Sequence, residues 1–310
     1  MSTASTPRSW SARNPETLGL WLGVLGVLIF AITLPATRLA TGTAENPQLS
    51  PWFVTLGRAA LAGLLSAAFL LVTRSPRPQA QHWKHLGWAV LGNALGYPLL
   101  LAYALRTVTA SHAAVVTALL PLVTAAVAAL VLHQRARLGF WVCAVLGSTL
   151  VVAFSLLHGW QQGHGFGLEA ADALLVGAVL AASVGYIHGA RVTPELGAER
   201  VICWVCLIAL PVTLPATLWL WPTAETSPPI TPAAWGGFLY VGIFSMWAGF
   251  FAWYRGLALG GALRVSQTQL LQPFLSILVA IPLLGEPLDG LTLGFALAVV
   301  ATVVVGKRLS

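Results

Sequence analysis

The sequence predicts an all-α membrane protein with ten transmembrane helices. Of the 310 residues, 57% are apolar and only 8% are charged, which is about a third of the charged fraction of a soluble domain. The apolar runs divide into ten segments of about 20 residues, the length at which a helix crosses a bilayer. Residues 113–132 are apolar on every face, whereas strands of a membrane barrel alternate apolar and polar residues. This composition excludes soluble enzymes, nucleotide-binding modules and nucleic-acid binders.

The elements follow in order from the N-terminus. Residues 1–17 are rich in Ser, Thr, Arg and Pro and contain no apolar run, so we expect a polar cytoplasmic tail rather than a secretory signal. The ten predicted helices then cover residues 18–40, 52–72, 86–105, 111–132, 138–157, 168–190, 201–221, 234–254, 263–284 and 290–306. About 100 residues remain for tails and loops, which is too few for a second folded domain.

The positive charges are distributed unevenly over the predicted loops. Of the 16 Lys and Arg residues, Arg38 and Arg58 lie within spans, Arg106 lies in a loop on one side, and the other 13 lie on the opposite side. Lys and Arg in short loops are retained on the cytoplasmic side of a membrane. We therefore expect both termini in the cytoplasm. The net charge of +7 then reflects topology rather than a nucleic-acid partner.

An internal repeat relates the two halves of the chain. A shift of 152 residues lays Pro121 on Pro273 and Leu119 on Leu271. Each half has five helices, an odd number, so the second half would enter the membrane from the opposite side, as in the inverted repeats of many secondary transporters. We predict one repeat over residues 18–157 and a second over residues 168–307. Chance alignment of two Leu- and Ala-rich helix pairs is the alternative explanation.

Several short motifs occur in a defined order along these spans. Residues 284–288 read Leu-Gly-Glu-Pro-Leu before an Ala- and Val-rich final helix, and residues 103–106 read Tyr-Ala-Leu-Arg before an Ala-rich helix that contains Pro121. Arg58 lies in the second predicted helix within Leu-Gly-Arg-Ala-Ala-Leu, and Arg38 lies near the end of the first. Together these motifs resemble the EamA family of the drug/metabolite transporter superfamily.

The resemblance covers almost the whole chain and implies two inverted five-helix EamA repeats that export small metabolites or amino acids. Gln134 departs from the family pattern, because the first repeat commonly has an acidic residue there, as Glu286 is in the second. The family also places the third and eighth helices around a central cavity. This makes Tyr97 and Trp253 candidate substrate-binding residues.

No catalytic constellation accompanies the spans. None of the nine acidic residues reaches the middle of a predicted helix, and the sequence lacks the motifs of serine hydrolases, zinc proteases and ATP-binding loops. Cys203 and Cys206 share one face of the seventh helix, where packing is a better explanation than a redox or metal site. We therefore predict a protein that is not an enzyme and that uses no catalytic residue, cofactor, metal ion or ATP.

Two arginines lie within predicted spans and are candidates for substrate binding. Arg38 lies about two residues from the outer end of its helix and could instead extend its side chain to the membrane surface. Arg58 lies about six residues in, or roughly 9 Å at the helical rise. Its guanidinium could pair with a substrate carboxylate. Hydrogen bonding between helices is the alternative role for Arg58.

The ninth predicted helix starts with an unusual density of polar residues. Gln269 and Gln272 share a polar arc that should face protein or water, and Pro273 removes a backbone donor and frees carbonyls one turn earlier. Pro121 repeats this helix break in the fourth helix, where His112 lies upstream. We predict that Gln269, Gln272 and His112 contact substrate. A structural glutamine zipper between helices is the alternative.

These features together predict a secondary transporter in a bacterial inner membrane. The expected partners are a small-molecule solute, an amino acid or related metabolite, and the lipid bilayer, with neither ATP nor nucleic acid, and a homodimer is compatible with the sequence. With no carboxylate at depth, the titratable candidates within spans are His112 and His188, and neither is central. We therefore expect facilitated diffusion or exchange rather than proton coupling. A membrane scaffold or signalling protein is the alternative function.

Overall fold

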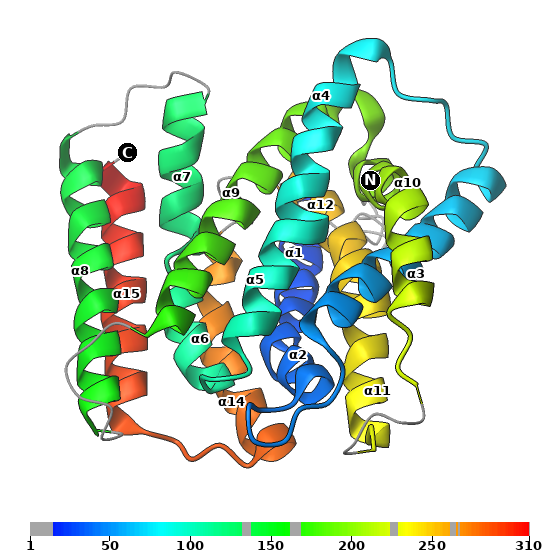
Figure 1. Ribbon diagram of the computed structural model, residues 1–310. Helices are drawn as coiled ribbons and strands as arrows, with labels where there is room; N and C mark the ends of the chain where they lie inside the picture. Colours follow the sequence, from blue (N-terminus) through cyan, green and yellow to red (C-terminus); the bar gives the residue numbers. More distant parts are fainter. Residues whose placement is uncertain are drawn as a thin grey trace, which may run out of the picture.

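Helices form every regular element among the residues that the computed structural model describes, which are 15–131, 138–161, 169–223, 229–260, 265 and 267–309 (Figure 1). In chain order the helices are α1 (Pro15–Ala31), α2 (Thr33–Thr41), α3 (Pro51–Val72), α4 (Ala80–Ala89), η1 (Val90–Gly96), α5 (Tyr97–Ala104), α6 (Ala110–Thr117), α7 (Leu120–Val131), α8 (Leu138–Gln161), α9 (Ala170–Leu196), α10 (Ala198–Trp219), α11 (Pro232–Tyr240), η2 (Val241–Ala248), α12 (Gly249–Gly260), η3 (Gln267–Leu271), α14 (Gln272–Leu284) and α15 (Gly290–Leu309). The prediction of an all-α fold is confirmed.

Seven stretches of the described chain are long and apolar enough to cross a membrane. They are Pro15–Thr41, Pro51–Val72, Ala80–Ala104, Ala110–Ala128, Ala170–Leu196, Ala198–Trp219 and Pro232–Gly256. Three further helices are apolar but shorter, at Trp141–Phe154, Thr268–Leu284 and Gly290–Val305. The protein is therefore a multi-pass membrane protein with at least seven spans.

Several helix boundaries differ from the prediction, and two of them have local explanations. The third predicted helix starts at Ala80 rather than at 86, because the His82 ring accepts a hydrogen bond from the Gln79 backbone N–H at 3.2 Å and so closes the first turn. The sixth continues to Leu196 rather than to 190. It ends where Gly197 takes a φ of +87°, a conformation that glycine adopts without strain.

The helices of the two halves pack in matched pairs. Helix α3 packs against its equivalent α10, and α8 packs against its equivalent α15. Helix α6 packs against α14, which is the equivalent of α7, the helix that follows α6. Figure 1 shows α8 and α15 side by side at one edge of the bundle. Helix α1 packs along α12, and the equivalent contact runs from α9 to α4, η1 and α5. This pattern is that of an architecture built from two repeats.

Glycines allow the closest of these contacts. A Cβ atom on Gly19 of α1 would clash with the backbone nitrogen of Gly260 in α12. A Cβ atom on Gly92 of η1 would clash with the carbonyl oxygen of Ala181 in α9. Small residues bring the backbones together in the same way in many membrane proteins.

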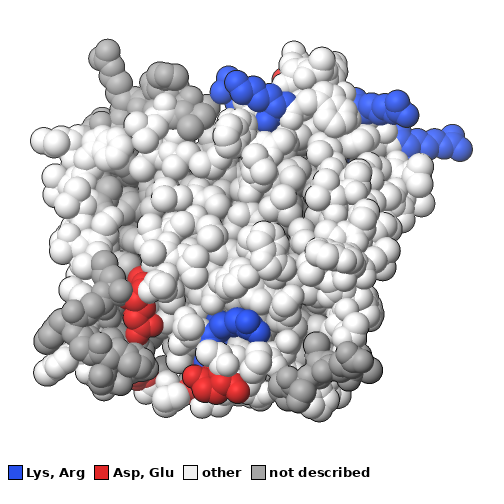
Figure 2. Space-filling model, in the orientation of Figure 1, with Lys and Arg blue, Asp and Glu red and all other residues white. Residues whose placement is uncertain are grey.

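The ends of the bundle carry opposite charge. Figure 2 shows Lys and Arg mainly at the end where α4 begins, and Asp and Glu mainly at the opposite end. Contacts at the first end join Glu195 to His82 and Arg255 to Glu199. We call this the basic end, and we call the end at which Glu286 approaches Arg38 the acidic end.

Candidate functional site

A small cavity lies in the centre of the bundle, between the two halves. Its polar lining comes from Thr33, Arg58, Asn93, Ser245 and Gln272, and its apolar and aromatic lining comes from Phe30, Tyr97, Leu120, Tyr186, Met246 and Phe250. The cavity volume is about 20 Å³. That is room for about one water molecule.

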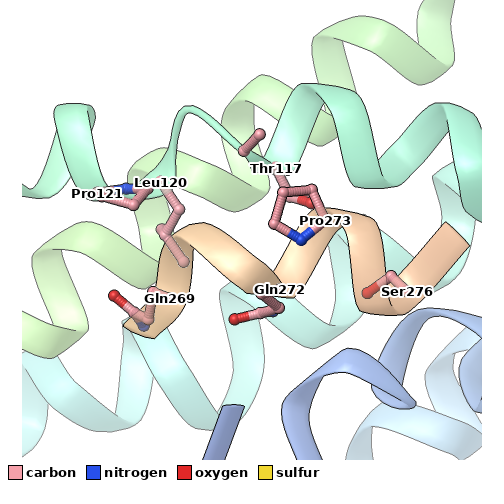
Figure 3. Close-up of a pocket in the computed structure, with 8 residues that line it drawn as sticks. Thr117, Leu120, Pro121, Gln269, Gln272, Pro273 and Ser276 are labelled. Carbon is pink, nitrogen blue, oxygen red and sulfur yellow. The ribbon is translucent and has the colours of Figure 1, made fainter. Parts of the chain in front are cut away.

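A second pocket of about 10 Å³ adjoins the cavity, between the α6–α7 segment of the first half and the η3–α14 segment of the second (Figure 3). Leu120 and Gln272 line both spaces. The lining includes Thr117 with Gln269, Leu120 with Gln272, and Pro121 with Pro273, and each pair is separated by 152 residues. The pocket is therefore built from equivalent positions of the two halves and lies on the axis that relates them.

The two prolines coincide with interruptions of their helices. Helix α6 ends at Thr117 and α7 begins at Leu120, immediately before Pro121. In the second half the 3₁₀-helix η3 runs to Leu271, and α14 begins at Gln272, immediately before Pro273. Proline has no backbone N–H and clashes with the preceding turn, so each break follows from the sequence. Irregular backbone of this kind is tolerated at membrane depth where it faces protein or a cavity.

Two π-helices contribute polar side chains to the lining of the central cavity. Helix η1 carries Asn93 and helix η2 carries Ser245, and these residues are 152 positions apart. Both side chains are buried and line the central cavity. Short π-helical segments are rare and occur frequently at functional sites. The internal repeat thus supplies the cavity with two polar groups at equivalent positions, each on a π-helical segment.

Among the described residues, Arg58 is the only cation that lines the cavity. Its side chain is 3% exposed, and its Nη2 donates a hydrogen bond to the Ser245 hydroxyl at 3.1 Å. Within the described part of the chain Arg58 forms no ion pair, and its Nε has no hydrogen-bond partner. The Asn93 Oδ1 also lacks a partner there. A buried charge without a counterion is costly, so this geometry favours a ligand that carries negative charge.

Aromatic rings form the apolar side of the same space. The rings of Phe30 and Phe250 meet edge to face with centroids 5.2 Å apart, and Tyr186 meets Phe250 at 6.2 Å. A few polar groups opposite an apolar wall are typical of a site for a small organic molecule.

Comparison with known proteins places this architecture in a family. A model of the EamA-like transporter family matches residues 17–156 and 170–306, one match for each half of the chain. The chain belongs to the EamA-like transporter family. The "Uncharacterized transporter YdeK" of Bacillus subtilis (strain 168) is 37% identical over 297 residues, which cover 96% of this chain and 99% of that protein.

A solved structure described as "Crystal structure of protein" shares the fold. It has a TM-score of 0.62 at 20% sequence identity, and the match covers 94% of this chain and 96% of the other. At that identity the likeness concerns the fold alone. The family membership rests on the family model and on YdeK.

Arg38 of this EamA-like transporter lies at the acidic end rather than in the central cavity. Its Nη1 donates to the carbonyl oxygens of Leu105, at 2.6 Å, and Val108, and its Nε lies 3.9 Å from Glu286 Oε1. Arg38 and Glu286 also line an open surface depression of about 270 Å³. Arg38 therefore lies outside the central cavity, and its role in substrate binding stays a prediction.

Glu286 connects the two EamA repeats at this end. Its carboxylate accepts hydrogen bonds from the backbone N–H groups of Ala110 at 2.7 Å and Ser111 at 2.9 Å, and from the Ser111 hydroxyl at 2.6 Å. These groups form the first turn of α6 in the other repeat. A carboxylate in this position satisfies otherwise unpaired donors and complements the helix dipole. Gln134, the equivalent position in the first repeat, lies outside the described residues.

The remaining predicted site residues divide into two groups. Arg58, Tyr97 and Gln272 line the central cavity, and Gln269 lines the adjoining pocket with Gln272. His112 lies instead against α9, with Nε2 2.8 Å from Asp172 Oδ1. Trp253 packs on Gly26 of α1, and its ring centroid lies 6.3 Å from that of Phe30. The roles of His112 and Trp253 in substrate binding stay predictions.

Asn93, Ser245 and Thr33 were not predicted as site residues from the sequence, although all three line the cavity. The internal repeat could have identified two of them, because the 152-residue shift pairs Asn93 with Ser245 and both are polar residues within apolar helices. Thr33 has no such signal. Its hydroxyl lies 2.8 Å from that of Ser245, so the two residues line the cavity side by side.

Proposed function

We propose that this EamA-like transporter exports small organic solutes that carry a carboxylate, amino acids or related metabolites, by alternating access. The observation that carries the proposal is Arg58, a buried guanidinium that forms no ion pair within the described residues and that lines a cavity between the two repeats. Arg pairs with a carboxylate in a planar, two-pronged geometry. A carboxylate would supply the missing counterion.

The other lining groups complement such a solute. The Asn93 amide and the hydroxyls of Thr33 and Ser245 can bind a polar substituent beside the carboxylate. Phe30 and Phe250 offer an apolar surface to the rest of the molecule. The cavity of about 20 Å³ is too small for any amino acid, so binding requires the repeats to move apart.

Closing contacts at both ends fit a transport cycle with an occluded stage. At the acidic end Glu286 joins α6 to the loop after α14. At the basic end His82 Nε2 lies 2.6 Å from Glu195 Oε2, and His85 Nδ1 lies 2.8 Å from His188 Nδ1, so α4 is held to α9. Release of one set while the other persists would open the cavity to one side only. The π-helices η1 and η2 are the proposed hinges, because their wide turns can rearrange to α-helical ones.

The topology is part of the proposal. The three shorter apolar helices complete ten crossings, five for each EamA match. The concentration of Lys and Arg at the basic end supports a cytoplasmic position for that end and for both termini. The relative from Bacillus subtilis supports a bacterial plasma membrane.

Exchange is the proposed mode of transport. An empty carrier must reorient with Arg58 lacking a counterion, whereas a loaded carrier reorients with the charge neutralised. None of the described residues that line the central cavity is Asp or Glu. His112 and His188, the candidate proton carriers within spans, lie against Asp172 and His85 rather than in the cavity.

Counterflow in proteoliposomes tests the function. Vesicles that hold the purified protein are loaded with an unlabelled amino acid and diluted into a trace of the labelled one, with a panel of amino acids and metabolites. Transient accumulation of label above equilibrium is expected. Each substrate is compared with its decarboxylated amine, which should not be exchanged. A scaffold would show no counterflow with any solute, and equal exchange of the amines would refute the role of the carboxylate.

A further inference from the structure

A large groove lies away from the central cavity, at the basic end between α1, α3, α10 and α12. Its volume is about 720 Å³ and it is open to the surroundings. Leu22, Phe69 and Phe251 line its apolar part, and Arg200, Arg255 and Glu199 line its polar part. Nothing in the proposed transport mechanism uses this groove.

The apolar part of the groove is built on an aromatic cluster. The ring of Phe69 in α3 meets that of Phe251 in α12 edge to face with centroids 5.0 Å apart, and Trp247 of η2 lies 4.7 Å from Phe251. This surface offers few hydrogen bonds to a polar solute. A hydrocarbon chain that covers it gains free energy in proportion to the apolar area removed from water.

The polar part carries excess positive charge. Arg255 Nη1 lies 3.3 Å from Glu199 Oε1, and Arg200 forms no ion pair with any residue in the described ranges. Two guanidinium groups therefore face one carboxylate. Next to them the backbone of Gly197 carries no side chain, and a Cβ there would meet nothing within 4 Å. The groove is thus open beside Arg200.

We propose that this groove binds an anionic phospholipid. The phosphate pairs with Arg200 and Arg255, and an acyl chain lies along Phe69 and Phe251. Both arginines lie toward helix ends at the basic end of the bundle, and basic pockets between helices at the cytoplasmic side are typical sites for such headgroups. The positively charged part of the groove lies next to its apolar part, just as the phosphate of a lipid lies next to its acyl chains.

Native mass spectrometry of the full-length protein tests this site. The delipidated protein is titrated with phosphatidylglycerol and, in parallel, with phosphatidylcholine of the same acyl chains. The wild-type protein should prefer phosphatidylglycerol. Arg200→Gln and Arg255→Gln should each lower this preference about fivefold, whereas Arg191→Gln, an exposed cation at the same end, should leave it unchanged. A photoreactive phosphatidylglycerol should cross-link to residues 69–73, 197–204 and 247–255.

Four outcomes would overturn the proposal. One is an unchanged lipid preference in the Arg200→Gln, Arg255→Gln double variant, and another is an equal loss in Arg191→Gln. Glycerol phosphate that displaces the lipid at equal concentration would reveal an anion site without a chain site. Displacement by a transported amino acid would instead make the groove a solute vestibule. The first three of these measurements do not depend on transport activity.

Discussion

Arg58 Nη2 lies 3.1 Å from the Oγ of Ser245, which is 187 residues away in the other repeat. The same hydroxyl lies 2.8 Å from that of Thr33. The cation of the central cavity is therefore held by a neutral group of the opposite EamA repeat. A neutral acceptor positions the guanidinium without neutralising it, which leaves its charge for a substrate.

Replacement of Arg58 should abolish exchange. Arg58→Gln removes the positive charge, and we expect counterflow to fall at least 100-fold, since charge-assisted pairs in buried sites are worth several kcal/mol. Arg58→Lys keeps the charge but loses the planar geometry and should retain partial activity with a weaker apparent affinity. The measurement is counterflow normalised to folded protein by size-exclusion chromatography. Full activity of Arg58→Gln would move the substrate site elsewhere.

The two glutamines of the ninth helical stretch should affect transport more than folding. Gln269→Leu and Gln272→Leu remove polar groups from the pocket beside Pro121 and Pro273, so transport should fall while expression and thermal unfolding stay near wild type. The larger loss is expected for Gln272, which lines both spaces. If the glutamines only join helices, the variants would instead unfold at lower temperature and keep their transport per folded molecule.

The Glu286 contact should stabilise the acidic end. Glu286→Ala leaves two backbone N–H groups and one hydroxyl without their acceptor, and loss of a helix cap costs about 1 kcal/mol. We expect a lower unfolding temperature and faster labelling of a cysteine placed at position 110, where the contact with Glu286 is made by the backbone N–H alone. Leu288→Ala, which shortens an exposed side chain of the same loop, is the control. Unchanged labelling would show that Glu286 does not hold this end closed.

Labelling of single cysteines from either side of the membrane tests the orientation of the protein. In a cysteine-free background, single cysteines at positions 8 and 308 should react only with reagents that reach the cytoplasm, and one at position 289 only from outside. These expectations follow from the excess of Lys and Arg at the basic end. Labelling of position 8 from outside would reverse the topology and the inferred direction of transport.

A proton gradient should have little effect on accumulation. With a gradient of two pH units across sealed proteoliposomes, we expect solute to equilibrate rather than to accumulate, because no carboxylate of the described chain lines the central cavity. His112→Gln and His188→Gln should behave as the parent protein in this assay. Sustained uphill accumulation that either substitution abolishes would identify that histidine as the proton carrier.

The sequence alone was enough to predict the all-α class, the family and its two repeats. Inside a bilayer, a long apolar segment can form all of its backbone hydrogen bonds within itself only as a helix. The apolar composition therefore decides the fold class. The breaks before Pro121 and Pro273 follow from the missing N–H of proline. The 152-residue shift predicts which helices are equivalent, and the structure packs α3 against α10 and α8 against α15.

Only the tertiary structure decided which polar side chains meet. Helices that are apolar on every face carry no periodic signal for their rotation about their own axes, so the sequence could not show that Asn93, Ser245 and Thr33 join Arg58 at one cavity. For the same reason, Arg38 and His112 could not be placed in advance at Glu286 and Asp172. Those positions are decided by close packing between the two repeats, which depends on the shapes of both surfaces at once.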